Sequence, residues 1–388
     1  MQPNQTPPNG WQRKRIADLF DVRASGDIDW SRWSSEQDAT HTHPVYANGR
    51  ADSGLHGYAS YAVEKSDAVT LTARGTLGEL GYAFFRSTSF TPIGRLLVLR
   101  SKGEVDARYF ASYINGRVRF AQENTGVAQL TAPQVTRYQI DLPPLSEQHA
   151  IATALSDVDA LIAGLEKLIA KKRDLKQAAM QQLLTGQTRL PGFSGEWAVK
   201  RLGDLAEMGS GGTPSSANAA FYGGEIPWVA IADMTGGGKY ISSTEKNLSV
   251  LGLANSAAQM FPAGAVLYAM YASLGECSIA TVPVTTSQAI LGIRPKADLH
   301  SEFLYYVLTS WKSMVKGLGQ QGTQANLNKG IVADFKISLP AVEEQISIAA
   351  VLIEMDTELV ALESRLAKTH ELKQGMMQEL LTGKTRLV

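Results

Sequence analysis

Apolar residues recur in two long stretches of the chain at alternating spacings of four and three positions. The first stretch runs from Ile151 to Ile169, and the second runs from Ile348 to Leu366. This spacing places the apolar side chains on one side of a helix and is typical of a coiled-coil seam. We therefore predict a helix–helix interface made by Ile151, Leu155, Val158, Ile162, Leu165 and Ile169 from one helix and Ile348, Leu352, Met355, Leu359, Leu362 and Leu366 from the other.

Both stretches carry the residues that usually mark the ends of a helix. Pro143 and Pro340 stand just before them, where a proline breaks no helical hydrogen bond. Gly186 and Gly383 stand just after them, in the usual C-terminal position. Past the seam, the apolar stripe is expected to shift to Leu175, Ala179 and Leu183 and to Leu372, Met376 and Leu380. Each helix of roughly 38 residues would be about 57 Å long.

The second helical segment repeats the first one at a fixed distance along the chain. Gln148 aligns with Gln345, and Glu166 aligns with Glu363, each 197 positions later and without a gap. Two amphipathic helices commonly do no more than pack on each other. A helix of this length is unusual inside a compact domain, however, and its unchanged length in both copies indicates that the length matters.

The parts of the chain that precede the two helices are repeated as well. Trp11 and Leu19 match Trp197 and Leu205, again within similar surroundings. Alternating apolar residues around glycine turns predict many short strands, and short helices are expected at 106–115 and 301–310. We predict an α+β fold of two mixed α/β domains and two long helices, divided into a disordered segment 1–10, domain 11–141, helix segment 142–190, domain 191–338 and helix segment 339–388.

Composition narrows the class of protein only partly. The 388 residues suffice for two or more domains, and no apolar run reaches the length of a membrane span. A lone Cys277 excludes an internal disulfide framework and fits the cytosol. The 37 basic and 37 acidic side chains argue mildly against nucleic acid, whose binding proteins are usually basic. A basic face can still arise if the charges are sorted in space.

No credible catalytic constellation is present in the sequence. Gly383, Lys384 and Thr385 resemble the end of a phosphate-binding loop, but Gln378 and Glu379 stand where the required first glycine would be. His41 and His43 lack the further ligands of a metal site, so we predict none. The pattern thus favours a binding protein over an enzyme that acts alone.

Polar and aromatic residues gather in the loops that differ between the two domains. Arg, Asn and Gln make bidentate contacts to purine edges, and Ser, Thr and Tyr suit phosphates. Any single one of them also fits a solvated loop. The candidate DNA-binding residues are Tyr46, Asn48, Arg50, Arg74 and Thr76 in the first domain and Thr213, Ser215, Trp228, Tyr268, Tyr271, Ser273, Gln288, Gln321, Thr323, Gln324 and Asn326 in the second.

Several of these segments together resemble the specificity subunit of type I restriction–modification enzymes. The resemblance rests on GSGGTPSSANAAFYGGEIPW at 209–228, the two LPP/LPA-x-x-EQ helix starts, the ELLTGKTRL ending and the domain–helix–domain–helix order. It covers nearly the whole chain. The first domain departs from the GxTP–YGGxIPW pattern.

The resemblance implies a non-catalytic subunit in which each domain reads one half of a split, asymmetric sequence of double-stranded DNA. It also implies antiparallel helices whose length sets the gap between the halves; about 57 Å corresponds to roughly 17 base pairs. Ile151, Leu155, Val158 and Ile162 would then face Leu366, Leu362, Leu359 and Met355. The implied partners are two modification subunits and restriction subunits, which would hold S-adenosylmethionine, ATP and magnesium; this chain would hold no cofactor. The rival hypothesis is a non-DNA interaction scaffold with two ligand-binding domains.

Overall fold

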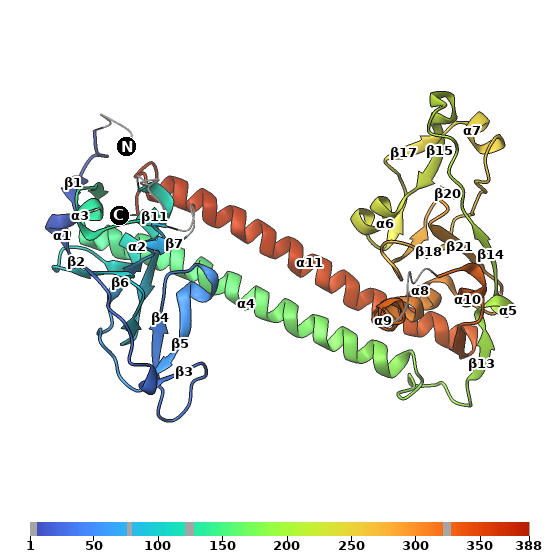
Figure 1. Ribbon diagram of the computed structural model, residues 1–388, viewed down its shortest axis with the longest axis horizontal. Coiled ribbons are helices and arrows are strands. Elements are labelled where there is room, and N and C mark those ends of the chain that lie inside the picture. Colours follow the sequence, from blue (N-terminus) through green and yellow to red (C-terminus); the bar gives the residue numbers. More distant parts are fainter. Residues whose placement is uncertain (1–5, 76–79, 121–127, 321–326, 388) are drawn as a thin grey trace. The chain divides into compact units, whose positions relative to one another are not determined.

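A computed structural model describes residues 6–75, 80–120, 128–320 and 327–387 of the chain (Figure 1). The chain divides into two compact units, one formed by residues 1–167 and 364–388 and the other by residues 168–363. Each unit therefore combines one globular domain with part of each of two long helices. These helices are α4 (Leu145–Leu183) and α11 (Val342–Leu380).

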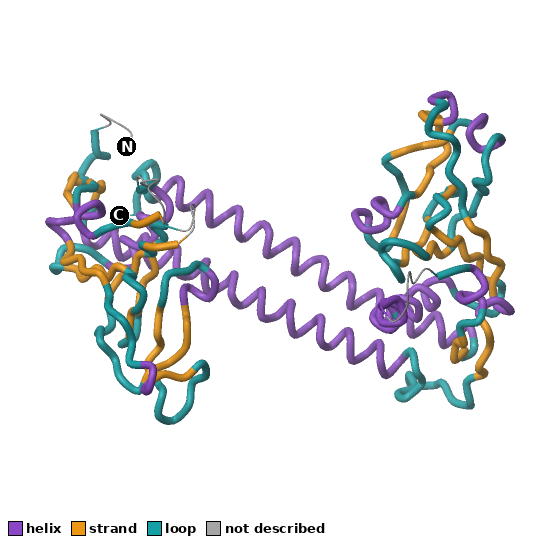
Figure 2. The backbone as a smooth tube through the Cα atoms, in the orientation of Figure 1, coloured by secondary structure: helices purple, strands orange, loops and turns teal. Residues whose placement is uncertain are grey.

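The two long helices form as the sequence predicts. Each contains 39 residues, and Figure 2 shows them as the longest continuous helical segments. Gly186 and Gly383 follow them with φ angles of 72° and 67°. This left-handed conformation is open to glycine at little cost and ends the helix. The predicted seam residues are buried or half-buried.

The predicted register of the helix pair is wrong, although the antiparallel direction is confirmed inside each unit. In the first unit Asp159 forms an ion pair with Lys373 at 2.5 Å, and Ile151 shares a core cluster with Leu380. The predicted register would instead place Ile151 beside Leu366. It would leave the last turns of both helices unpaired, whereas the observed register buries Leu380 and its counterpart Leu183.

The predicted continuation of the apolar stripe is confirmed at Leu183 and Leu380, which are buried, but not at its first residue in either helix. Leu175 and Leu372 are 47% and 57% exposed, so neither lies in the seam. The spacing of four and three instead leads to Lys176 and Lys373, two lysines 197 positions apart. Lys176 forms an ion pair with Asp356 in the second unit, as Lys373 does with Asp159 in the first. Each unit therefore has a charged pair within the seam, which continues past it to the buried Leu183 and Leu380.

The first domain is built on an antiparallel sheet with the strand order β2-β10-β6-β8. Helix α2 packs against β6 and β8. A second sheet has the order β3-β5-β4-β9, in which β4 and β9 run parallel. The elements of this domain are β1 (Gln12–Arg15), α1 (Ile16–Leu19), β2 (Phe20–Ala24), η1 (Trp30–Arg32), β3 (Trp33–Ser34), β4 (His43–Tyr46), η2 (Ala51–Gly54), β5 (Leu55–Ala59), β6 (Ala68–Leu71), β7 (Arg74–Gly75), β8 (Ala83–Arg86), β9 (Thr91–Pro92), β10 (Leu97–Ser101), α2 (Ala107–Arg117), β11 (Ala128–Gln129), α3 (Ala132–Thr136) and β12 (Gln139–Leu142).

The second domain repeats this plan with the strand order β14-β21-β18-β19-β16 and a second sheet β17-β15-β20. The parallel pair of β15 and β20 takes the place of β4 and β9, and β16 adds a further parallel pairing with β19. The two domains thus share their topology even where their sequences diverge. The elements are β13 (Ala198–Arg201), α5 (Leu202–Leu205), β14 (Ala206–Ser210), η3 (Ala219–Phe221), β15 (Tyr222–Val229), α6 (Ile231–Gly237), β16 (Tyr240–Ile241), β17 (Lys246–Leu248), α7 (Val250–Ala254), β18 (Val266–Ala269), β19 (Cys277–Ala280), β20 (Thr285–Thr286), β21 (Ile290–Pro295), α8 (Ser301–Ser310), α9 (Lys312–Gln320), α10 (Lys329–Ala333) and β22 (Lys336–Leu339).

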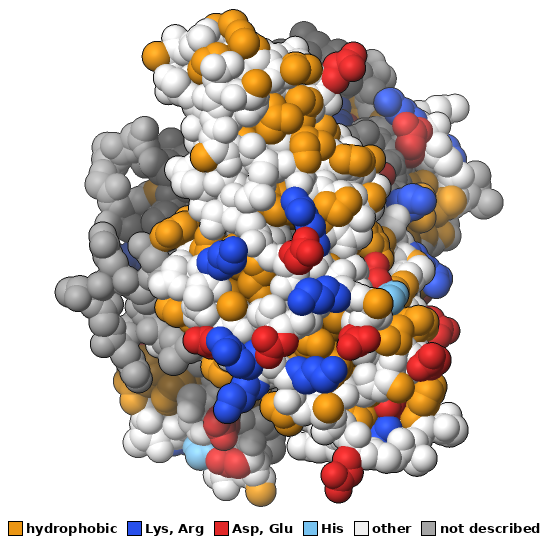
Figure 3. Space-filling view, turned by 90° about the vertical axis from the view of Figure 1, so that its right-hand side faces the viewer, with side chains coloured by type: hydrophobic (Ala, Val, Ile, Leu, Met, Phe, Trp, Pro, Cys, Tyr) orange, Lys and Arg blue, Asp and Glu red, His pale blue; other side chains and the backbone are white. Residues whose placement is uncertain are grey.

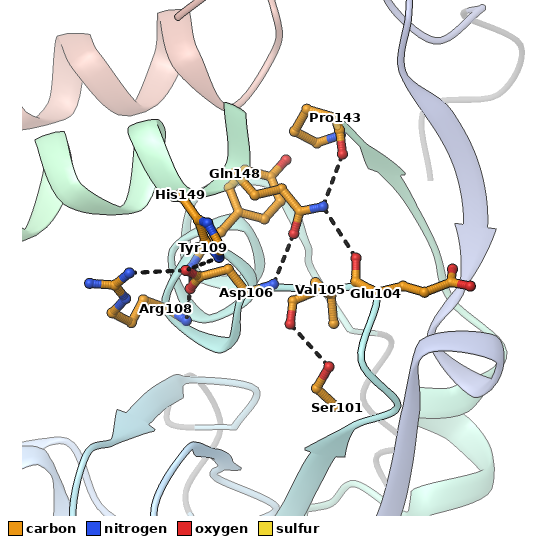
Figure 4. A network of polar contacts seen from close by, with 9 residues as sticks. All are labelled: Ser101, Glu104, Val105, Asp106, Arg108, Tyr109, Pro143, Gln148 and His149. Atoms are coloured by element: carbon orange, nitrogen blue, oxygen red, sulfur yellow. Dashed lines mark hydrogen bonds and ion pairs between the residues drawn. The ribbon is translucent and has the colours of Figure 1, made fainter. Parts of the chain in front are cut away.

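The start of α4 is fastened to the first domain by the side chain of Gln148 (Figure 4). Its Oε1 accepts a hydrogen bond from the Asp106 backbone N–H at 2.9 Å, and its Nε2 donates to the Pro143 carbonyl at 2.9 Å. In the second unit Gln345 accepts from the His300 N–H at 2.8 Å and donates to the Pro340 carbonyl at 2.9 Å. The repeated glutamine therefore joins each domain to the helix that follows it.

Part of the segment that we expected to be disordered is in contact with the C-terminal end of the chain. The Asn9 carbonyl accepts a hydrogen bond from Arg386, and the Pro8 carbonyl accepts one from the Trp11 N–H at 2.9 Å. Residues 6–10 are therefore ordered in this structure, whereas residues 1–5 lie outside the described part. The polar, proline-rich sequence of residues 6–10 gave no sign of the long-range contact with Arg386.

Candidate nucleic-acid interface

Two candidate residues of the second domain, Thr213 and Gln288, meet at its surface. The Thr213 hydroxyl donates a hydrogen bond to the Gln288 side-chain carbonyl, and both residues are exposed. Thr213 follows β14, and Gln288 lies in the short loop that connects β20 to β21. The structure therefore brings together two polar side chains that are 75 positions apart in the sequence.

Two glycines make this approach possible. A Cβ atom on Gly211 would collide with the Thr286 and Ser287 carbonyls, and one on Gly212 would collide with the backbone of Ala257. The GSGG segment therefore lies directly on neighbouring backbone, as only glycine allows. This packing explains why glycines precede Thr213 in the GSGGTP sequence.

Trp228 and Tyr268 are core residues, so the prediction that they contact DNA does not fit this structure. Trp228 is 8% exposed, and its indole N–H donates to the Gly212 carbonyl at 2.9 Å. Tyr268 is fully buried, and burial raises the pKa of its hydroxyl. Both were selected for their residue type, which the sequence could not distinguish from a core role. Trp228 nevertheless supports the loop that presents Thr213.

Three other candidates of the second domain lie near turns. Ser215 is exposed after the glycine segment, whereas Tyr271 and Ser273 are half-buried in the turn between β18 and β19. That turn needs a positive φ angle at Ala272 (58°) and at Gly275 (78°). The structure thus keeps these polar groups close to the surface, and the Met270 N–H donates to the Ala289 carbonyl at 2.9 Å, next to Tyr271 and Gln288 in the sequence.

In the first domain, Asn48 is already occupied by contacts within the protein. Its Nδ2 donates to the Gly94 carbonyl at 2.6 Å, and its Oδ1 accepts from the N–H groups of Ala73 (2.7 Å) and Arg74 (3.2 Å). The amide therefore joins its own loop to the backbone at 73–74 and at Gly94. These contacts suit a residue that holds the neighbouring loops in place.

The two candidate arginines of the first domain are exposed. The guanidinium carbon of Arg50 lies 3.8 Å from the centre of the Tyr82 ring, and Arg74 lies in β7. Tyr46 is half-buried, with the guanidinium carbon of Arg86 3.4 Å from the centre of its ring. Thr76, Gln321, Thr323, Gln324 and Asn326 lie outside the described residues.

Charges of both signs are mixed on the described surface of the second unit. Figure 3 shows Lys and Arg interspersed with Asp and Glu over the middle of one face, beneath a region with little charge. Within the second unit, Lys200 forms an ion pair with Asp298 at 3.6 Å. A face of this kind offers no broad positive field for the phosphate backbone.

The described residues offer no sign of metal or thiol chemistry. Among them, no three His, Cys, Asp or Glu side chains form a group suited to a metal ion. Cys277 is buried, and burial raises the pKa of its thiol. No helix in the described part of the chain is long and apolar enough to cross a membrane.

A cleft of about 620 Å³ in the first domain was missed by the sequence interpretation. Of its lining residues, Tyr46 is among our DNA-binding candidates and Tyr58 belongs to the same polar and aromatic cluster of the sequence, whereas Gln37 and His43 were not selected for DNA binding. These residues come from two strands and a loop. No spacing in the sequence indicates that they lie together.

Known proteins resemble this chain in sequence or in fold. A specificity subunit of the type I restriction enzyme MjaIX from Methanocaldococcus jannaschii is 33% identical over 165 residues, which is 42% of this chain and 38% of that protein. The HindI specificity subunit from Haemophilus influenzae is 34% identical over 150 residues, covering 38% of this chain and 32% of that protein. The matched segments thus span about a third of the length of these relatives.

A crystal structure of a type I restriction–modification S subunit from M. genitalium has the same fold, with a TM-score of 0.67. It covers 98% of both chains at 14% sequence identity. The sequence model described as "Type I restriction modification DNA specificity domain" matches residues 8–172 and 194–374. Because these two matches take in most of both halves, the chain belongs to the family of type I restriction–modification DNA specificity domains.

Proposed function

We propose that this protein is the DNA-reading specificity subunit of a type I restriction–modification system. Each domain reads one half of a bipartite, asymmetric target in double-stranded DNA. The observation that carries this proposal is a shared topology with unlike surfaces. The strand orders repeat between the domains, but the exposed Thr213–Gln288 pair of the second has no sequence counterpart in the first. One framework with two different surfaces suits the reading of two different sequences.

The polar side chains on these surfaces support DNA as the ligand. Gln288 carries an amide that can pair with an adenine edge, and Arg50 and Arg74 carry guanidinium groups suited to guanine or phosphate. The relatives described above are specificity subunits of type I restriction enzymes. A scaffold that binds another class of ligand would explain the two long helices equally well. It would not explain the sequence similarity to these specificity subunits.

The chain itself performs no chemistry in this proposal. Two modification subunits dock on the paired helices, and restriction subunits complete the assembly in the cytoplasm. The partners hold S-adenosylmethionine, ATP and magnesium, while this chain holds no cofactor. The purified chain should therefore neither methylate nor cut DNA, and methyl transfer by this polypeptide alone would contradict the proposal.

The two long helices set the gap between the two half-targets. Four residues inserted after Ala170 and four more after Ala367 would lengthen both helices by about one turn, or about 6 Å. Because the positions are 197 apart, the insertions preserve the repeat. The methylated target should keep both half-sequences and gain about one or two base pairs in its gap. An unchanged gap would show that the helices do not set the spacing.

A further inference from the structure

The first domain has an open cleft between its second sheet and the loop that follows β8. Residues of β4 and β5, the strands labelled in Figure 1, border it, and its volume is about 620 Å³. The two strands are paired in antiparallel register, with Pro44 opposite Tyr58. The lining residues are Gln37, Thr42, His43, Pro44, Tyr46, Leu55, Tyr58, Ser66, Ser87, Thr88 and Ser89.

The chemistry of this lining is polar but uncharged. Among the described residues, no lysine, arginine, aspartate or glutamate lines the cleft. It offers an amide, an imidazole and several hydroxyl groups beside two tyrosine rings. Phosphates are usually held by cationic side chains or by a helix N-terminus. The cleft therefore suits a neutral ligand with an apolar surface and several hydrogen-bonding groups, which are the properties of the edges of base pairs.

The polar groups at the cleft are available for a ligand. The side chains of Gln37, His43 and Tyr58 form no hydrogen bond with any residue that the structure describes. Gln37 is exposed, and the other two are half-buried. Asn48, in contrast, already uses both ends of its amide inside the protein. Gln37 is therefore free to bind a ligand through its amide, whereas Asn48 is not.

Two supports hold the walls of the cleft in place. Beneath Tyr46, the buried Arg86 donates to the Thr70 hydroxyl at 2.9 Å and to the Ser53 carbonyl at 2.7 Å. Burial lowers the pKa of Arg86 to about 10, so this guanidinium stays charged near neutral pH and fixes the tyrosine ring. In the loop that carries Gln37, the Asp38 carboxylate accepts from the N–H groups of Thr40 and His41, both at 2.7 Å. A rigid wall with free polar groups is suited to selective binding.

We infer that this cleft is the base-reading surface of the first domain, with Gln37 and His43 as specificity-determining residues. Their side chains contact the edges of base pairs in one half of the target, while Tyr46 and Tyr58 provide apolar contact. The exposed Arg50 contacts the phosphate backbone. The inference rests on the proposed function and adds to it the surface that reads the first half.

The test uses the full chain, expressed with its modification subunit in a host whose methylated sites are then sequenced. Gln37→Ala and His43→Ala are compared with Gln12→Ala, an exposed glutamine on β1 that lies outside the cleft. In a separate variant, residues 193–338 are replaced by the matching domain of a relative. The half of the target that survives this replacement is the half that the first domain reads.

We expect each cleft variant to become tolerant at one position of that half. A lost bidentate contact corresponds to discrimination about 5- to 150-fold weaker at the position. The other half and the Gln12→Ala target should stay unchanged. Two results would overturn the inference: an unchanged target in both cleft variants, or methylation that weakens evenly in both halves of the target. The domain replacement would still support the proposed function in either case. Failure of the unaltered chain to direct methylation to any two-part target would overturn both.

Discussion

Arg386 forms a bidentate ion pair with Glu147, a residue 239 positions earlier in the chain. Its Nε lies 2.6 Å from Glu147 Oε1, and its Nη2 lies 2.7 Å from Oε2. Arg189 makes the same pair with Glu344, at 2.6 and 2.7 Å, in the second unit. The loop after each long helix is thus fastened to the start of the other helix. This explains why the EQ and LTGxTR sequences are repeated together.

Removal of this arginine should destabilise the first unit, because Glu147 is 1% exposed and would lose its ion-pair partner in a buried position. We expect Arg386→Ala to lower the melting temperature clearly more than Lys384→Ala, which removes an exposed lysine from the same loop. Adding Glu147→Gln to Arg386→Ala should recover part of the loss, since the buried group is then neutral. Equal melting temperatures for the two single variants would show that the pair contributes little.

The glutamine that joins each domain to its helix gives a second test. Gln148→Ala leaves the Asp106 N–H and the Pro143 carbonyl without their partner in a buried site. We expect a loss of about 1–3 kcal/mol in the free energy of unfolding, measured by urea denaturation. Gln181→Ala, on the exposed side of α4, is the control. A loss no greater than that of the control would count against a joining role.

The observed seam can be tested with two neighbouring residues of similar size. Ile162 is 8% exposed, whereas Leu161 is 41% exposed. Ile162→Ala should reduce the free energy of unfolding by about 2–5 kcal/mol, the usual cost of a truncated core residue. Leu161→Ala should change it by about 0.5 kcal/mol or less. The opposite order would mean that the helix pair uses a different face.

Asp38 provides a test that involves pH. The His41 N–H, the His41 ring and the Thr40 N–H together lower the pKa of its carboxyl from 3.8 to about 2. A lowered pKa means that the contribution to stability is complete above the ordinary value and is lost as the pH falls through about 2. The loop that carries Gln37 should therefore keep its conformation from pH 5 upwards.

The corresponding variant, Asp38→Ala, should relax the first half of the target at neutral pH without unfolding the domain. Circular dichroism checks the fold, and sequencing of methylated sites checks the target. In a carboxyl-detected titration by NMR, an Asp38 pKa near 4 would show that the loop is not organised by this side chain.

The sequence could predict the helices and the repetition because both depend on local or periodic signals. The spacing of Ile151, Leu155 and Ile162 identifies the seam face, and Gly186 identifies the helix end. The register could not be predicted in the same way. A pattern that repeats every seven residues leaves several registers equally apolar, and the Asp159–Lys373 pair helps to select one of them.

The candidate site was predicted less completely, since residue type does not reveal burial. Trp228 and Tyr268 were selected as aromatic residues near glycines, yet both are core residues. His43 was not selected as a DNA-binding residue, although β4 and β5 bring it to one cleft with Tyr58. That proximity arises from strand pairing, which leaves no fixed spacing in the sequence. Thr213 and Gln288 were selected for their chemistry, and only the structure brings them into contact.

The central claim is that each domain reads one half of a DNA target, and replacement of residues 193–338 tests it most directly. The chain and its modification subunit are expressed in a host, and the methylated sites are determined by sequencing before and after the replacement. We predict a two-part target in which one half changes while the other half and the gap stay the same. A target that changes in both halves, or in neither, would contradict the account.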